Sequence, residues 1–149
     1  MPSIALTYMT SAAACLVAGV TMGIVMGITH DFALAPVHAH LNLLGWASLA
    51  LMGLTYRAWP ELAALRTLAL VQLALSAPSA MLMPAGIFLA MQGGGIGLAV
   101  AASVTWLVGA VLFLVRLALL LLAATRPVQR AVLWVPCSGC NVHPHGHVV

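Results

Sequence analysis

The residues best suited to chemistry in this chain are two histidines separated by one alanine, His38 and His40. They lie in the stretch PVHAHLNLLGW, residues 36–46, and His30 shortly precedes it. On an α-helix each residue turns by about 100°, so side chains two positions apart point about 200° apart. The two imidazoles are therefore expected on opposite sides of one helix, where they can serve two different sites.

Three kinds of site can use these imidazoles. Neutral imidazole nitrogens bind haem iron axially, and the space between membrane helices can hold the macrocycle. Imidazoles also bind copper or zinc, and His30, His38 and His40 would supply three of them. The third alternative is structural, with the histidines hydrogen-bonded to Asn42, to Asp31 or to water. Because ionisable residues are rare in membrane spans unless they have a function, the pair favours a cofactor or metal site.

The composition predicts the environment in which these histidines work. The chain has 149 residues, of which 64% are hydrophobic and 5% are charged, and its mean hydropathy is +1.14. A soluble domain of this size cannot bury so much apolar surface, so an integral membrane protein in contact with the lipid bilayer is expected. The five arginines are too few and too dispersed for nucleic-acid binding.

Four apolar segments are each long enough to cross a bilayer as a helix, which takes roughly 20 residues. Since a backbone in lipid must satisfy its own hydrogen bonds, the predicted fold is an all-α, four-helix membrane bundle. Residues 1–125 form the expected transmembrane domain, and residues 126–149 form a flexible cytoplasmic tail. No basic residue precedes the first segment, which therefore reads as a retained span and not as a signal peptide. The expected spans are Ile4–Ile28, Pro36–Arg57, Leu65–Met91 and Ile96–Leu122.

The arginines predict the orientation. Arg57 and Arg66 lie on either side of the link between the second and third spans, and Arg126 and Arg130 follow the fourth span. The positive-inside rule places these regions and both termini in the cytoplasm of a multi-pass protein. The expected location is a bacterial-type inner (plasma) membrane, with the histidine segment near its outer face.

Further polar residues near the cytoplasmic side are expected at the membrane interface. Tyr56, Arg57 and Trp59 are predicted to be interfacial anchors, with the arginine snorkelling towards the head groups. Arg116 falls inside the fourth span, and snorkelling is favoured over burial as a ligand-binding side chain. This would make Arg116 a marker of the inner boundary of the membrane.

Helix packing is suggested by the spacing of small and polar residues. Gly19, Gly23 and Gly27 recur every four residues in the first span, a pattern that lets helices approach closely, although glycine is frequent in membrane helices in general. On the second span, Asn42 is four residues after His38, and both share a face with Gly45.

The tail contains potential metal ligands, one C-x-x-C pair and three histidines. It lacks the histidine that must directly follow C-x-x-C for covalent haem attachment. Because the segment is short and rich in glycine and proline, adventitious metal binding is the default interpretation and a built zinc or copper site is the alternative. These ligands are Cys137, Cys140, His143, His145 and His147.

One segment resembles a known family. Residues 38–46, HAHLNLLGW, followed by residues 52–60, MGLTYRAWP, look like one helix of the haem–copper oxidase catalytic subunit, in particular of the cbb-type oxidases and nitric oxide reductases. In that family the two histidines bind two different haems from opposite sides of the helix. The resemblance implies haem b as cofactor, with His38 facing a high-spin-type haem and His40 a low-spin-type haem. The other residues of the implied cofactor-binding segment are Asn42, Gly45 and Trp46.

The resemblance covers one span of four. The family's catalytic subunit has about twelve helices, arranged as three arcs of four around a pseudo-threefold axis, so this chain would supply one arc. Its other spans carry no histidine for copper and no evident cross-linked tyrosine. Three copies would rebuild the ring with true threefold symmetry, which makes a homotrimer the expected assembly.

The resemblance thus implies an oxidoreductase-like role in electron transfer or in handling a diatomic gas, O2 or NO, with a quinol or a cytochrome as a candidate electron donor. Copper is a second candidate cofactor. One alternative is a non-enzymatic copper- or zinc-binding membrane protein that uses the outer histidines, with methionines or the tail assisting. The other is an accessory structural subunit whose histidines only form hydrogen bonds.

Overall fold

The computed structural model describes residues 3–125, and every regular element within that range is helical. Four helices are long and apolar enough to span a membrane, which confirms the predicted all-α class and the number of spans. The bounds agree closely with the expected ones; the largest difference is at the end of the fourth span, which reaches Thr125. The spans are Ile4–Thr29, Ala35–Ala58, Arg66–Met91 and Gly97–Thr125.

The second span changes its helical type along its length. Pro36 lies in the first turn of this span, where its missing N–H costs no hydrogen bond. In the middle, the Oγ of Ser48 donates to the carbonyl of Leu43, five residues earlier, at 2.8 Å. π-Helices are rare and are often found at functional sites, so the wide turns directly after the two histidines single out this segment. Its parts are α2 (Ala35–His40), the π-helix η1 (Leu41–Ser48) and α3 (Leu49–Ala58).

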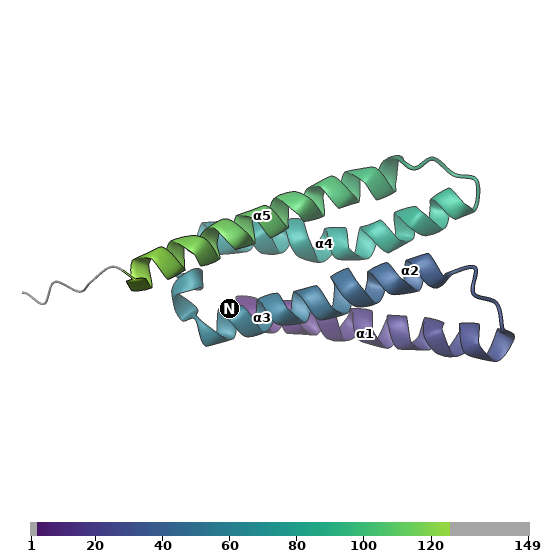
Figure 1. Ribbon diagram of the computed structural model, residues 1–149, viewed down its shortest axis with the longest axis horizontal. Helices are drawn as coiled ribbons and strands as arrows, with labels where there is room; N and C mark the ends of the chain where they lie inside the picture. The colour runs from purple at the N-terminus through teal and green to yellow at the C-terminus, as the bar shows by residue number, and fades with distance from the viewer. Residues whose placement is uncertain (1–2, 126–149) are drawn as a thin grey trace, which may run out of the picture.

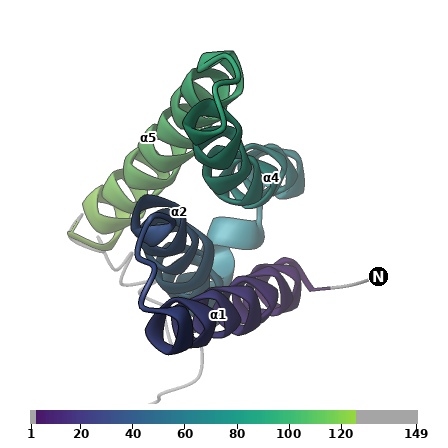
Figure 2. The same cartoon turned by 90° about the vertical axis from the view of Figure 1, so that its right-hand side faces the viewer.

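The spans pack as two antiparallel hairpins, shown in Figure 1. The first hairpin pairs α1 (Ile4–Thr29) with the second span, and the second pairs α4 (Arg66–Met91) with α5 (Gly97–Thr125). The 3-10 helix η2 (Pro60–Ala63) joins them, and α2 and η1 also contact α4. α5 packs on α4 and η2 but makes no comparable contact with α1 or α2, so the four spans form an open arrangement with α5 at one edge (Figure 2).

The two ends of the bundle carry different residues. The α1–α2 link and the α4–α5 link lie together at one end (Figure 1), which we call the histidine end because it holds His30, His38 and His40. The opposite end contains η2 between Arg57 and Arg66, and we call it the arginine end. The histidines and these arginines are therefore separated by most of the length of the spans.

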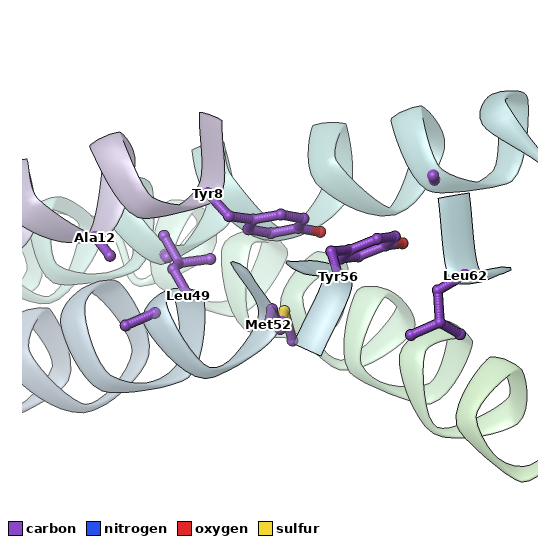
Figure 3. Packing of buried hydrophobic residues seen from close by; sticks show 9 residues of the cluster. Tyr8, Ala12, Leu49, Met52, Tyr56 and Leu62 are labelled. Atoms are coloured by element: carbon purple, nitrogen blue, oxygen red, sulfur yellow. The ribbon is translucent and has the colours of Figure 1, made fainter. Parts of the chain in front are cut away.

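The apolar core lies towards the arginine end. Tyr8 of α1 stacks on Tyr56 of α3, with ring centroids 5.6 Å apart, and Leu49 packs beside them (Figure 3). α5 supplies none of the fully buried members of this core, but half-buried side chains on one side of it, among them Trp106 and Phe113, pack against the core. The buried residues of α5 are Ala102, Gly109 and Arg116, which recur every seven positions along one line.

Candidate cofactor site

The histidine pair is positioned by the close approach of the second span to α1. A Cβ atom built on Gly19 would lie 2.6 Å from the side-chain amide of Asn42, and one on Gly23 would lie 3.0 Å from Cε1 of His38. The first distance is too short for a real Cβ atom and the second is unusually tight, so these glycines make room for the polar residues of the second span. The close packing expected of the glycine stripe is confirmed at these two positions but not at Gly27, which has no neighbour within 4 Å.

His38 is half-buried between α1 and the second span. Its Nδ1 lies 2.9 Å from the carbonyl oxygen of Gly19. Since a carbonyl oxygen can only accept, Nδ1 carries the proton and Nε2 keeps its lone pair. The Nδ2 of Asn42 donates to the main-chain carbonyl of His38 at 2.9 Å and lies 3.5 Å from its Nε2. The same Nδ2 lies 3.3 Å from Nδ1 of His38, so the asparagine amide lies near both ring nitrogens.

His40 is also half-buried, and its ring has the same tautomer. Its Nδ1 lies 2.8 Å from the carbonyl oxygen of Pro36, one helical turn earlier, and donates to it. Its Nε2 makes no hydrogen bond within residues 3–125. His40 thus presents an unoccupied basic nitrogen on the side of the helix opposite to His38.

The remaining predicted residues of the segment are packed rather than open. Gly45 is buried against Cys15 of α1, and a Cβ atom there would lie 2.7 Å from the cysteine Sγ. Trp46 is half-buried and packs against the apolar core. His38, Asn42 and Gly45 all lie against α1, as their spacing predicted.

The predicted three-histidine metal site has no support in the described part of the chain. His30 is exposed at the C-terminal end of α1, where its φ of 53° places it in the left-handed region. Among residues 3–125, no group of three His, Cys, Asp or Glu side chains is close enough to hold a metal ion. The tail ligands Cys137, Cys140, His143, His145 and His147 lie outside the described residues.

A second polar cluster lies towards the arginine end, and the sequence analysis placed two of its members wrongly. Arg116 does not snorkel: it is 8% exposed, and its Nη1 donates to the hydroxyl of Tyr56 and, at 3.2 Å, to Oε1 of Gln72. Tyr56 is not an interfacial anchor, because it is 4% exposed and donates to the same Oε1 at 2.7 Å. Its ring also lies under the guanidinium, 5.5 Å from Cζ, a favourable cation–π distance. Arg57 and Trp59 are exposed, as interfacial anchors should be.

Three buried polar atoms of this cluster have no hydrogen-bond partner within the described residues: the hydroxyls of Tyr8 and Ser76, and Nε2 of Gln72. The spacing of polar residues in the sequence indicates part of this cluster. Gln72, Ser76 and Ser79 recur at intervals of four and three residues, which places three polar side chains on one face of an apolar span.

Comparison with known proteins identifies no relative: no family model, no curated protein and no solved structure matches this chain. The resemblance carried by residues 38–60 therefore stays a prediction, and function must be argued from the geometry of the site.

Proposed function

We propose that this chain is a haem b-binding membrane protein that acts, as a homotrimer, in electron transfer or in the handling of a diatomic gas such as O2 or NO. His38 and His40 are the proposed axial ligands. The proposed location is a bacterial-type inner membrane with both termini in the cytoplasm and the histidine end towards the outer face, with a quinol or a cytochrome as electron donor.

The observation that carries this proposal is the hydrogen bonding of the two imidazoles. Each ring donates Nδ1–H to a main-chain carbonyl, His38 to Gly19 and His40 to Pro36, so the free lone pair is on Nε2 in both. Histidines that bind metals typically donate their other ring nitrogen in this way, which fixes the tautomer and the ring orientation. In the neutral imidazole this tautomer leaves the lone pair of Nε2 for axial ligation, which supports the proposal.

The two histidines differ in how freely they could bind. Nε2 of His40 has no partner in residues 3–125, whereas the side-chain amide of Asn42 lies against the ring of His38, 3.3 Å from Nδ1 and 3.5 Å from Nε2. The ring of His38 is therefore the more crowded of the two. We therefore expect His40 to be the stronger ligand, with His38 binding a second haem or leaving an open position at its iron.

The open arrangement of the spans supports the proposed trimer. α5 presents most of its apolar surface outward, and no other span of the described chain covers it. A second copy can cover such a face, and three copies close a ring. The assembly would place each histidine-bearing span next to a neighbouring chain.

The haem supplies a redox-active iron, and its ligand number distinguishes the two roles. Two strong axial ligands suit electron transfer, whereas one ligand with an open position suits binding of a gas. In this chain, His40 would hold one iron, and His38, on the opposite side of the helix, would hold a second; a further ligand to either iron would come from a neighbouring chain.

A specific observation also favours a second candidate, the accessory structural subunit. The contact between His38 and the carbonyl of Gly19 ties α1 to the second span without any cofactor. In this alternative the histidine mutants lose stability but no bound group.

The test is the absorption spectrum of the oxidised and reduced protein, purified after expression with ample haem. We expect a Soret band and a b-type spectrum in a trimeric species.

His40→Ala should lower haem occupancy at least about tenfold, as loss of a ligand does. His30→Ala is the matched control, because His30 is exposed, and it should bind haem as the wild type does. A wild-type protein without a Soret band, or haem retained equally by His40→Ala and His38→Ala, would refute the proposal.

A further inference from the structure

The arginine end contains a cavity that the proposed haem site does not use. It has a volume of about 240 Å³ and lies between η2, the start of α4 and the last turns of α5. One charged residue of each sign lines it, Arg116 and Glu61. The rest of the wall is apolar and consists of Leu62, Leu65, Leu68, Leu119 and Leu120.

Arg116 has no counter-ion among residues 3–125. Its hydrogen bonds all leave from Nη1 and go to two neutral groups, the hydroxyl of Tyr56 and the amide oxygen of Gln72. Nε and Nη2 make no hydrogen bond in the described part of the chain, although the side chain is more than nine-tenths buried. A buried guanidinium without an anion is costly in an apolar environment, so the cavity that it lines is suited to an anionic group.

Among the described residues, Glu61 is the only acidic side chain near this cavity. The sequence contains two acidic residues, and the other, Asp31, lies at the histidine end. Glu61 is exposed and lines the same cavity, yet the hydrogen bonds of Arg116 go elsewhere. The cavity therefore presents a positive group and a separate negative group, which together complement a zwitterion.

A neighbouring cavity extends the apolar surface. It has a volume of about 400 Å³ and shares Glu61 and Leu120 with the first cavity. Trp59 lines this second cavity and is 51% exposed, and tryptophan is typical of the head-group level of a membrane. The residues that line both cavities lie at Arg116 or between it and the arginine end, so the two cavities are on the head-group side of Arg116.

The depth of Arg116 also agrees with the head-group boundary. Its partner Gln72 lies six residues after the start of α4, or about 9 Å along the helix. α4 has 26 residues and α5 has 29, so both exceed the about 30 Å hydrocarbon core of a bilayer and extend into the interface. A lipid phosphate at this boundary is within reach of the guanidinium.

We propose that the paired cavities at Glu61 bind one phospholipid with an amine-bearing, zwitterionic head group. Glu61, at the arginine end, receives the ammonium, and Arg116 receives the phosphate at a deeper level. The acyl chains continue from there past Arg116 towards the middle of the membrane. This assignment uses none of the histidine residues and does not depend on haem binding.

The test is native mass spectrometry of the full chain after equilibration with equal amounts of phosphatidylethanolamine and phosphatidylglycerol. The wild type should retain phosphatidylethanolamine preferentially. E61Q, an exposed substitution that should leave the fold intact, removes the partner of the ammonium. It should lower the ratio of bound ethanolamine to glycerol lipid by about threefold, the size expected for one exposed ion pair.

Two further variants complete the test. R116Q should lose retention of both lipids, whereas R57Q, whose arginine is exposed and lines neither cavity, should behave as the wild type. Equal retention of both lipids by the wild type would overturn the proposal, as would an unchanged ratio in E61Q. Should R116Q fail to fold, the E61Q result decides the question alone.

Discussion

At the histidine end, α1 and the second span approach closely because glycines leave room for the side chains of His38 and Asn42. At the arginine end, the spans are joined instead by hydrogen bonds among buried polar side chains, centred on Arg116, Tyr56 and Gln72. Both solutions suit a membrane, where lipid is as apolar as the helices and burial of apolar surface drives little association.

The difference matters for function. At the histidine end, each imidazole donates one hydrogen bond from Nδ1 to a main-chain carbonyl. The Nε2 of His40 remains available for a ligand. At the arginine end, three buried polar atoms have no hydrogen-bond partner and the guanidinium of Arg116 has no anion within residues 3–125. The proposed haem site rests on the first property, and the proposed lipid site rests on the second.

The close steric packing at the histidine end should tolerate substitutions less well than the hydrogen-bonded cluster at the arginine end. Gly86 of α4 is the extreme case, since a Cβ atom there would lie 2.5 Å from the main-chain nitrogen of Ala99 in α5. Main chain cannot move aside without shifting the helix. We expect Gly86→Ala to lower the free energy of unfolding by about 3 kcal/mol, at the upper end for overpacking, measured by unfolding in mixed detergent–SDS micelles.

The matched control is Gly97→Ala, at the first residue of α5, where no atom lies within 4 Å. Alanine favours helix, so this variant should be as stable as the wild type or more stable by up to about 1 kcal/mol. Similar losses in both variants would mean that the α4–α5 contact does not depend on close approach.

A smaller loss is expected for Gly19→Ala. Its Cβ atom would meet the side chain of Asn42 at 2.6 Å, and a side chain can turn away where a backbone cannot. We expect a loss of about 1–2 kcal/mol in the same unfolding assay. Gly27→Ala has no neighbour to meet and should be neutral; if it is as harmful as Gly19→Ala, the glycines act through the helix itself and not through the contact with the second span.

The sequence predicted the fold well because the determinant of each span is local. A run of apolar residues of sufficient length must form a helix in lipid, and the four spans were placed to within a turn of their observed ends. The π-helix η1 was not predicted, since no composition rule separates it from an α-helix. A π-helix differs from an α-helix in its hydrogen-bond register. The side chains of Leu41–Ser48 do not indicate that difference.

For the polar residues, the outcome depended on contacts between distant segments. Arg116 and Tyr56 are 60 positions apart, and each considered alone is interpreted, wrongly, as an interfacial residue. Their burial follows only when α3 and α5 both meet Gln72 on α4. By contrast, His38 and Asn42 are one turn apart on one helix, so their common face could be derived from the helical period.

The last and smallest prediction concerns the polar cluster. Tyr56→Phe keeps the ring stacked on Tyr8 but removes the hydroxyl that donates to Gln72 and accepts from Arg116. Hydrogen bonds between membrane helices contribute about 0.6–1.7 kcal/mol, so a loss of about 1 kcal/mol is expected in the unfolding assay.

Tyr8→Phe removes the other hydroxyl of the stacked pair and is an unusually close control, because the two rings lie side by side (Figure 3). The hydroxyl of Tyr8 lies beside the hydroxyl of Ser76 but forms no well-aligned hydrogen bond in the described residues, so its removal should cost little or nothing. A loss in Tyr56→Phe without a matching loss in Tyr8→Phe would show that hydrogen bonds hold the arginine end together. Equal losses would instead assign its stability to ring packing, and the contrast with the histidine end would then disappear.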